Sequence, residues 1–157
     1  GKARTQQQSR PAYTEAQKLV KLSAALKTAQ ENANMTDSHV TRAQGKEDKA
    51  SEKLADEDMK IAGINDEIKK ARKEGRLTSR LEKAFSKKLQ AARSARRRVY
   101  GEFKAAQKLV RDKQKIAKDA QLRSDNLGRT YKTQSENYTG RFGNTHNFQI
   151  AAPDESN

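Results

Sequence analysis

An uninterrupted heptad repeat constrains this chain more than any other feature of its sequence. Steps of alternately three and four residues from Leu19 reach Ala71 through sixteen positions, of which thirteen are apolar. The exceptions are Thr36, Glu47 and Glu57. A strict repeat of this kind over seven heptads predicts a helix that packs along a narrow seam, as in a coiled coil.

The first long helix is expected to span residues 14–74. Residues 1–13 are polar and basic and contain a proline, which predicts an extended N-terminal arm. Residues 32–45 combine Asn, Thr, Ser and Gly, and this composition marks a possible kink. Lysines and arginines followed by Gly75 predict the end of the helix, and residues 75–79 should form a turn.

A second repeat predicts a second long helix over residues 80–127. Ten of its fourteen heptad positions are apolar. A short connection between two long helices favours an antiparallel pair. The expected fold is therefore all-α: a long antiparallel helical hairpin, or coiled-coil rod, with an extended N-terminal arm and C-terminal tail. The expected helix-packing seam comprises Leu19, Leu22, Leu26, Leu54, Ile61, Ile64, Ile68, Leu81, Phe85, Val99, Leu109 and Ile116.

The charge of the chain is strongly positive and unevenly placed. The formal net charge is +14, and residues 69–115 alone hold eighteen basic and four acidic residues. The second repeat also defines the face of the helix opposite its seam. Between residues 76 and 118 this face has thirteen positions, of which ten are basic and none is acidic. A solvated face, the alternative interpretation, usually mixes both signs because neighbouring like charges repel. The pattern favours a stripe that faces a polyanion or an acidic partner.

We call these ten basic residues, together with Arg93 beside them, the basic stripe. It comprises Arg76, Arg80, Lys83, Lys87, Arg93, Arg97, Lys104, Lys108, Arg111, Lys115 and Lys118. A row of cations of this kind follows phosphates without reading bases, so no sequence specificity is expected.

Residues 128–157 differ in texture from the rest of the chain. They have no helical period but contain four of the eight aromatic residues. Aromatic side chains along an extended polar segment are suited to docking into pockets on a partner; the alternative is that they fold back on the hairpin. The expected docking residues are Tyr131, Tyr138, Phe142 and Phe148.

No pattern in the sequence predicts catalysis. Cysteine is absent, and His39 and His146 are far apart and outside any carboxylate cluster. We expect no catalytic residue, metal site or cofactor. No stretch approaches 18 consecutive apolar residues, so no transmembrane segment is expected either.

Residues 62–103 carry AGINDEIKKARKEG, RLTSRLEKAF and RSARRRVYGEF. In this order of isoleucine-bearing helix, glycine break and basic helix, the segment resembles the middle of the small internal core (ejection) proteins of T7-like podoviruses. The resemblance implies a place near the packaged DNA of a virion.

These features together predict a non-enzymatic structural subunit of a large assembly, a phage virion component near packaged DNA that docks through its seam and tail. Such a subunit would form a homo-oligomer or dock on a ring of other subunits, and would contact nucleic acid only through its backbone. One alternative is a sequence-independent nucleic-acid-binding protein, ribosome-associated or chromatin-like. Another is a coiled-coil adaptor whose basic stripe faces an acidic protein. Outside a virion, we expect an intracellular protein that is not secreted.

Overall fold

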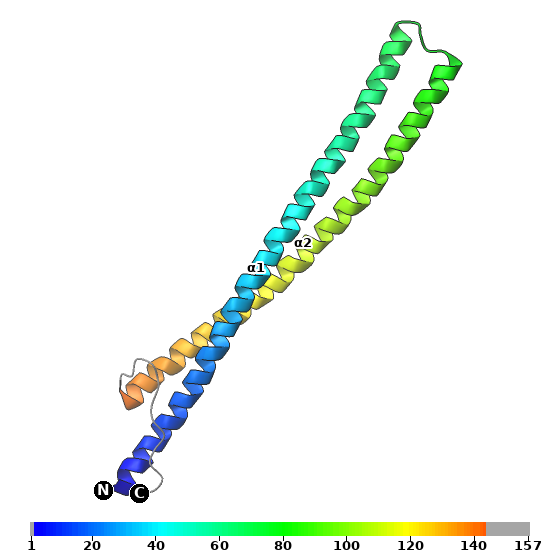
Figure 1. The fold of residues 1–157 in the computed structure, drawn as a ribbon. Coiled ribbons are helices and arrows are strands. Elements are labelled where there is room, and N and C mark those ends of the chain that lie inside the picture. The colour runs from blue at the N-terminus through cyan, green and yellow to red at the C-terminus, as the bar shows by residue number, and fades with distance from the viewer. Residues whose placement is uncertain (1, 144–157) are drawn as a thin grey trace. The chain divides into compact units, whose positions relative to one another are not determined.

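A computed structural model of the chain describes the backbone of residues 2–143 and the side chains of residues 10–143. The fold is all-α, with two long helices: α1 spans Lys2–Lys73 and α2 spans Ser79–Phe142 (Figure 1). Ala, Lys, Glu, Gln and Arg dominate both helices, and these residues have high helix propensity. The predicted all-α helical hairpin is confirmed.

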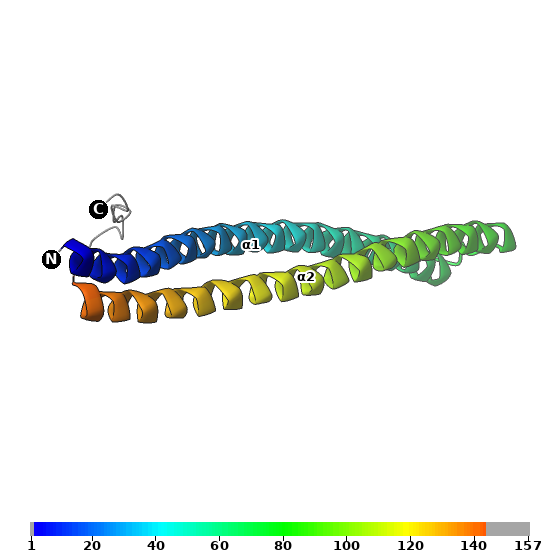
Figure 2. The same ribbon diagram turned by 90° about the horizontal axis from the view of Figure 1, so that it is seen from below.

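The chain divides into two compact units. Unit 1 combines residues Gly1–Asp37 with Ile116–Asn157, so it pairs the first half of α1 with the last part of α2. Unit 2 is the continuous segment Ser38–Lys115, in which the two helices lie side by side and are joined by the turn (Figures 1 and 2).

The turn between the helices is fixed by caps on both sides. Gly75 has φ +70°, and the amides of Gly75 and Arg76 donate hydrogen bonds to the carbonyls of Arg72 (3.2 Å) and Ala71 (2.9 Å). This pair of bonds is a Schellman cap, which requires a left-handed residue that glycine adopts without strain. Thr78 then caps α2, because its hydroxyl oxygen accepts a bond from the amide of Leu81 at 3.2 Å. The predicted turn at 75–79 is therefore correct to within one residue.

The predicted N-terminal arm over residues 1–13 is wrong, because α1 already begins at Lys2 and contains Pro11. Proline removes one backbone donor and disturbs a helix, but it does not always end one. The residues around it are mostly Gln, Arg, Lys and Ala, which favour helix. The possible kink at residues 32–45 does not interrupt the helix: α1 continues through this segment. Thr36 is buried there, and its hydroxyl donates to the carbonyl of Ala33 at 2.9 Å.

The second helix is longer than predicted. It continues through Gly128, where the sequence pattern placed its end, and stops at Phe142 before Gly143, whose φ is +89°. Gly128 faces α1 within unit 1: a Cβ atom built on it would lie 3.9 Å from Leu26 Cδ1. The expected extended tail over 128–157 is therefore helical as far as residue 142, and residues 144–157 lie outside the described part.

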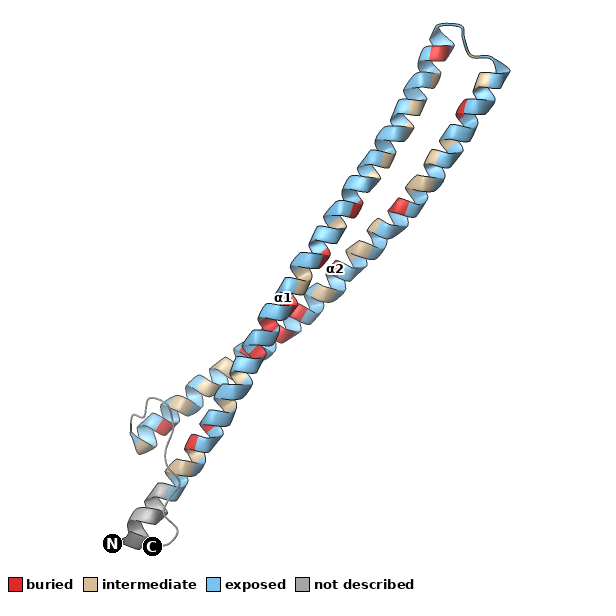
Figure 3. Cartoon of the chain, in the orientation of Figure 1, coloured by how far each residue is buried: buried red, intermediate tan, exposed pale blue. Residues whose placement is uncertain are grey.

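Burial follows the predicted heptad positions of α1 closely. All sixteen positions from Leu19 to Ala71 are buried or half-buried (Figure 3). On α2 the buried positions agree with the predicted repeat as far as Phe85. From Leu89 onwards, every second buried residue lies one position later in the sequence than the repeat predicts. Its buried and half-buried members include Phe85, Leu89, Ala92, Arg96, Val99, Phe103, Ala106, Val110, Lys113, Ala117, Ala120, Ser124 and Leu127.

Two of the twelve predicted seam residues are consequently misplaced. Leu109 and Ile116 are exposed, and the neighbouring Val110 and Ala117 are buried in their stead. Each pair is two apolar residues in succession, so the apolar pattern fits either member. In both pairs the smaller residue is the buried one, which suits the close approach that an alanine-rich α1 permits. The other ten predicted seam residues are buried or half-buried.

Candidate nucleic-acid interface on the outer face of α2

The basic stripe lies along α2 and the turn that precedes it. All eleven of its residues are exposed. Because the buried line of α2 is shifted by one residue, nine of them occupy two adjacent exposed lines of α2, while Arg76 lies in the turn and Arg93 lies beside the buried line. All but Lys118 belong to unit 2. No carboxylate interrupts these two lines between residues 83 and 118.

Most of the stripe makes no polar contact within the described residues. Two members have such a contact: Arg76 pairs with Glu74 at 2.6 Å, and Arg97 donates to the hydroxyl of Ser94 at 3.1 Å. Lys104 lies over the ring of Tyr100, with its Nζ 5.5 Å from the ring centroid. The other eight have no ion pair or hydrogen bond to the described part of the chain. The fold therefore does not neutralise this face.

The spacing of the stripe also works against the helix. Lys104, Lys108, Arg111, Lys115 and Lys118 follow one another at intervals of three or four residues. Like charges at this spacing destabilise a helix by about 0.2–0.5 kcal/mol for each pair. The described part of the chain places no acidic residue on these lines to relieve the repulsion.

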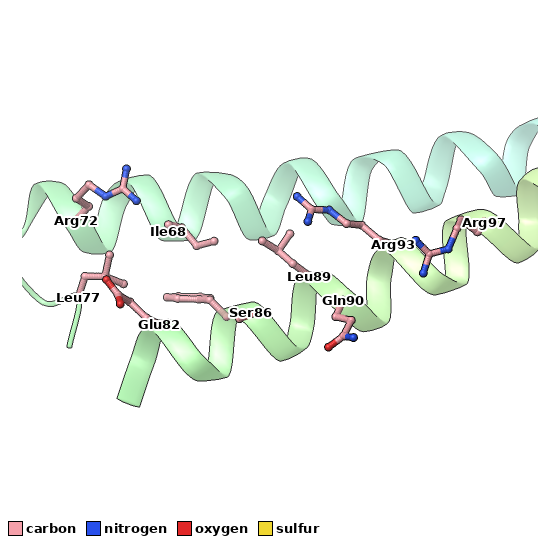
Figure 4. A pocket seen from close by; sticks show the side chains of 10 residues that line it. Ile68, Arg72, Leu77, Glu82, Ser86, Leu89, Gln90, Arg93 and Arg97 are labelled. Atoms are coloured by element: carbon pink, nitrogen blue, oxygen red, sulfur yellow. The ribbon is translucent and has the colours of Figure 1, made fainter. Parts of the chain in front are cut away.

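Arg93 is the one stripe residue that the structure moves to another surface. With Ile68 and Leu89 it lines a groove between α1 and α2 close to the turn (Figure 4). The side chains of Ile68 and Leu89 point into the space between the helices, and Gln90 points away from α1 (Figure 4). The one-residue shift in the seam explains the difference, since it moves Arg93 from the flank of the stripe to a position beside the buried line. Arg97 also borders this groove.

A neighbouring arginine is occupied by the hairpin itself. Arg96 is half-buried on the seam, and its Nε donates to Asp58 Oδ1 of α1 at 2.5 Å. Its guanidinium carbon also lies 5.8 Å from the centre of the Tyr100 ring. The run of arginines at residues 96–98 is therefore divided between helix pairing and the outer face.

The aromatic residues expected to dock on a partner instead pack within unit 1. Tyr138 is only 2% exposed and forms a small core with Ala16 and Leu19. Tyr131 and Phe142 pack against this core, and the rings of Tyr138 and Phe142 are 5.1 Å apart. The docking prediction is therefore wrong for these three residues, and Phe148 lies outside the described residues. Their intervals of seven and four residues are a helical signal that the sequence reasoning did not use.

The sequence reasoning also overlooked the outer face of α1 within unit 2. Between residues 48 and 66, one line of exposed residues there recurs at alternating intervals of four and three, and every charged residue on this part of the line is acidic; the same spacing then reaches Lys69 and Lys73. This acidic line comprises Asp48, Glu52, Ala55, Met59, Ala62 and Asp66. Its heptad spacing could have been found in the sequence, but the alanines hid it.

Neither helix contains, in its described part, a segment long and apolar enough to cross a membrane. Residues 10–143 also bring together no group of three or more His, Asp or Glu side chains that could hold a metal ion. Comparison of the chain with protein-family models, curated proteins and solved structures gave no match.

Proposed function

We propose that this protein is a non-enzymatic helical subunit that binds the phosphate backbone of nucleic acid through the basic stripe, without reading base sequence. The observation that carries the proposal is the pair of acid-free lines that the basic stripe forms along α2, on which most cations have no partner within the described residues. Binding to a polyanion would remove the repulsion between neighbouring cations and release counterions from the phosphates.

The geometry favours backbone contact over base recognition. A straight helix with a cation at most turns presents charges at roughly 5 Å intervals along one line. Lysine and arginine on such a line contact phosphates, which carry no sequence information. Base readout needs a cluster of side chains that enters a groove, usually with bidentate hydrogen-bonding residues. The outer face of α2 offers mainly lysines on a line and is suited to the first mode.

The setting that we propose is a large assembly around nucleic acid, specifically a virion, with the protein beside the packaged DNA. The resemblance of residues 62–103 to internal core proteins of T7-like podoviruses supports this setting. A helical hairpin also suits a structural role, because it holds a charged face in a fixed line without needing a deep core.

The proposal is tested by titrating random-sequence duplex DNA at several salt concentrations between about 50 and 200 mM. The test variant replaces Lys83, Lys87, Lys104 and Lys108 with Gln. A matched control replaces four cations on the outer side of α1 in the same unit, all of them exposed and removing the same net charge. These are Arg42, Lys46, Lys49 and Lys53.

If the four stripe residues contact phosphates, the slope of log affinity against log salt should become shallower by about 3 to 4 in the stripe variant. The control should keep a slope within about one of the native protein. Equal losses in both variants would mean that net charge alone governs binding, and weak binding by all three proteins would refute the proposal.

A further inference from the structure

Within unit 2, a line of exposed residues on α1 between residues 48 and 66 carries charge opposite to that of the basic stripe on α2. On α1 the acidic line contains Asp48, Glu52 and Asp66, and no basic residue lies on it between residues 48 and 66, although the same spacing continues to Lys69 and Lys73. On α2 the basic stripe covers the equivalent positions. Both lines are exposed and follow a heptad spacing of their own, distinct from that of the buried seam. Each helix of unit 2 therefore has a second regular face that its partner in the hairpin does not cover.

Small residues on these faces have no explanation inside the hairpin. Gly63 and Gly101 lie in helix interiors, where glycine is unfavourable, and a Cβ atom on either would meet nothing within 4 Å. Ala62 lies next to Gly63 on the acidic line, and Met59 on the same line is 72% exposed. Small residues and an exposed methionine on a regular helix face are suited to close approach by another helix.

We propose that the acidic line of α1 docks on the basic stripe of α2 in a second copy of this chain. With the two helices antiparallel, one register places all three acidic residues opposite basic ones and the smallest residues opposite each other. This register pairs Asp48 with Lys115, Glu52 with Arg111, Ala55 with Lys108, Met59 with Lys104, Ala62 with Gly101, and Asp66 with Arg97. The aliphatic stems of the two lysines cover the alanine and the methionine.

The residues beside this line agree with the same register. Asp112 is the one acidic residue on the outer half of α2 between residues 103 and 118, and it comes opposite Lys49 of the second copy. The acidic residue that flanks the stripe on α2 thus meets one of the several cations that flank the acidic line on α1. A surface selected only for solubility gives no reason for this match.

The interface joins different faces of the two copies, so it is heterologous and can repeat. Within one hairpin Asp58 of α1 lies beside Arg96 of α2, so paired residue numbers add up to 154. In the proposed contact between copies they add up to 163. Neighbouring copies are therefore shifted by nine residues along the helix axis. At 1.5 Å per residue this stagger is roughly 13 Å. It leaves Arg76, Arg80, Lys83 and Lys87 beyond the turn of the neighbouring α1. Self-association and nucleic-acid binding by this end of the stripe are therefore compatible.

Sedimentation velocity on two charge-reversal variants tests the proposal. The first carries Asp48→Lys, Glu52→Lys and Asp66→Lys, and the second carries Arg97→Glu, Arg111→Glu and Lys115→Glu. The native chain should associate at low salt and dissociate as salt is raised, and each variant alone should stay monomeric. An equimolar mixture should associate again, because each altered face meets its complement. A monomeric native chain at low salt, or a mixture that stays monomeric, would overturn the proposal.

Gly101→Gln provides a second measurement on a variant that should fold well. Glutamine favours helix over glycine, so this variant should melt at a higher temperature than the native chain. Its side chain would fill the space facing Ala62, and self-association should weaken at least tenfold. Native association by a stabilised Gly101→Gln chain would contradict the register.

The inference goes beyond nucleic-acid binding, and the two can fail separately. The first charge-reversal variant keeps the whole basic stripe, so it should bind duplex DNA at least as tightly as the native chain while failing to self-associate. If the native chain is monomeric but shows the expected salt slope, only the self-association proposal is lost. Self-association without DNA binding would remove only the proposed function.

Discussion

The register of α2 against α1 can be tested at two adjacent residues, Leu109 and Val110. Val110 is 6% exposed and Leu109 is 37% exposed, although Leu109 is the larger apolar residue. We predict that Val110→Gln destabilises the protein by about 2 kcal/mol. Loss of a buried valine contributes roughly 1.5 kcal/mol or more, and incomplete hydration of the new amide adds to this. The full penalty is not expected, because Gln107 and Gln114 line a groove beside Val110 through which the amide can reach water.

Leu109→Gln is the matched control, since it introduces the same side chain one position away. Glutamine and leucine have similar helix propensities, and the new amide would stay in water. We therefore expect a loss below about 0.5 kcal/mol. Urea unfolding followed by far-ultraviolet circular dichroism measures both effects. With an m-value of about 2 kcal/mol per molar urea, the Val110 variant should lower the midpoint by roughly 1 M.

A larger loss for Leu109→Gln than for Val110→Gln would refute the register of the structure and restore the one that the apolar pattern predicts. Equal losses would mean that neither residue is specifically buried by α1. Unchanged m-values in both variants would show that the comparison concerns stability alone.

Two further predictions concern other parts of the fold. Leu19→Ala should destabilise unit 1 by about 2–3 kcal/mol in the same urea assay. The reason is that Leu19 is its most deeply buried large side chain and packs with Tyr138. A loss below about 1 kcal/mol would contradict this core. Asp58→Asn should lower the free energy of unfolding by less than about 1 kcal/mol, since both partners of its pair with Arg96 are partly exposed. This loss should shrink as salt is raised. A large, salt-independent loss would contradict an exposed pair.

Helix type and pairing could be predicted from the sequence because the evidence for them is local and repeated. The repeat on α1 gave every buried position from Leu19 to Ala71, and Gly75 marked the turn. On α2 the repeat was ambiguous wherever two apolar residues follow each other, as at Leu109 and Val110. Which of the two is buried depends on the shape of the facing helix, and periodicity does not contain that information.

The ends of the helices were misjudged for a different reason. Pro11 and Gly128 were interpreted as breaks, although a single unfavourable residue can be carried by the helix around it. In unit 1 the helical C-terminal part of α2 is held by Tyr138 against Leu19, which lies more than one hundred residues away in the sequence. A tertiary contact of this kind overrides local propensity.

The candidate site was predicted in part. The position of the basic stripe on the outer face of α2 followed from its sorting onto one side of the repeat, and nine of its eleven members lie there, the exceptions being Arg76 in the turn and Arg93. That Arg96 is engaged by Asp58 could not be predicted, because the two residues belong to different helices. The acidic line of α1 was missed since alanines interrupt its charges.

Lysine-reactivity footprinting with and without duplex DNA, below the concentration of self-association, tests the central claim most directly. It reports which amines nucleic acid covers in the native chain, with no substitution. The account predicts that DNA protects Lys83, Lys87, Lys104 and Lys108 from modification and leaves Lys46 and Lys53 of α1 as reactive as before. Equal protection on both helices, or protection confined to α1, would contradict a nucleic-acid interface on the outer face of α2.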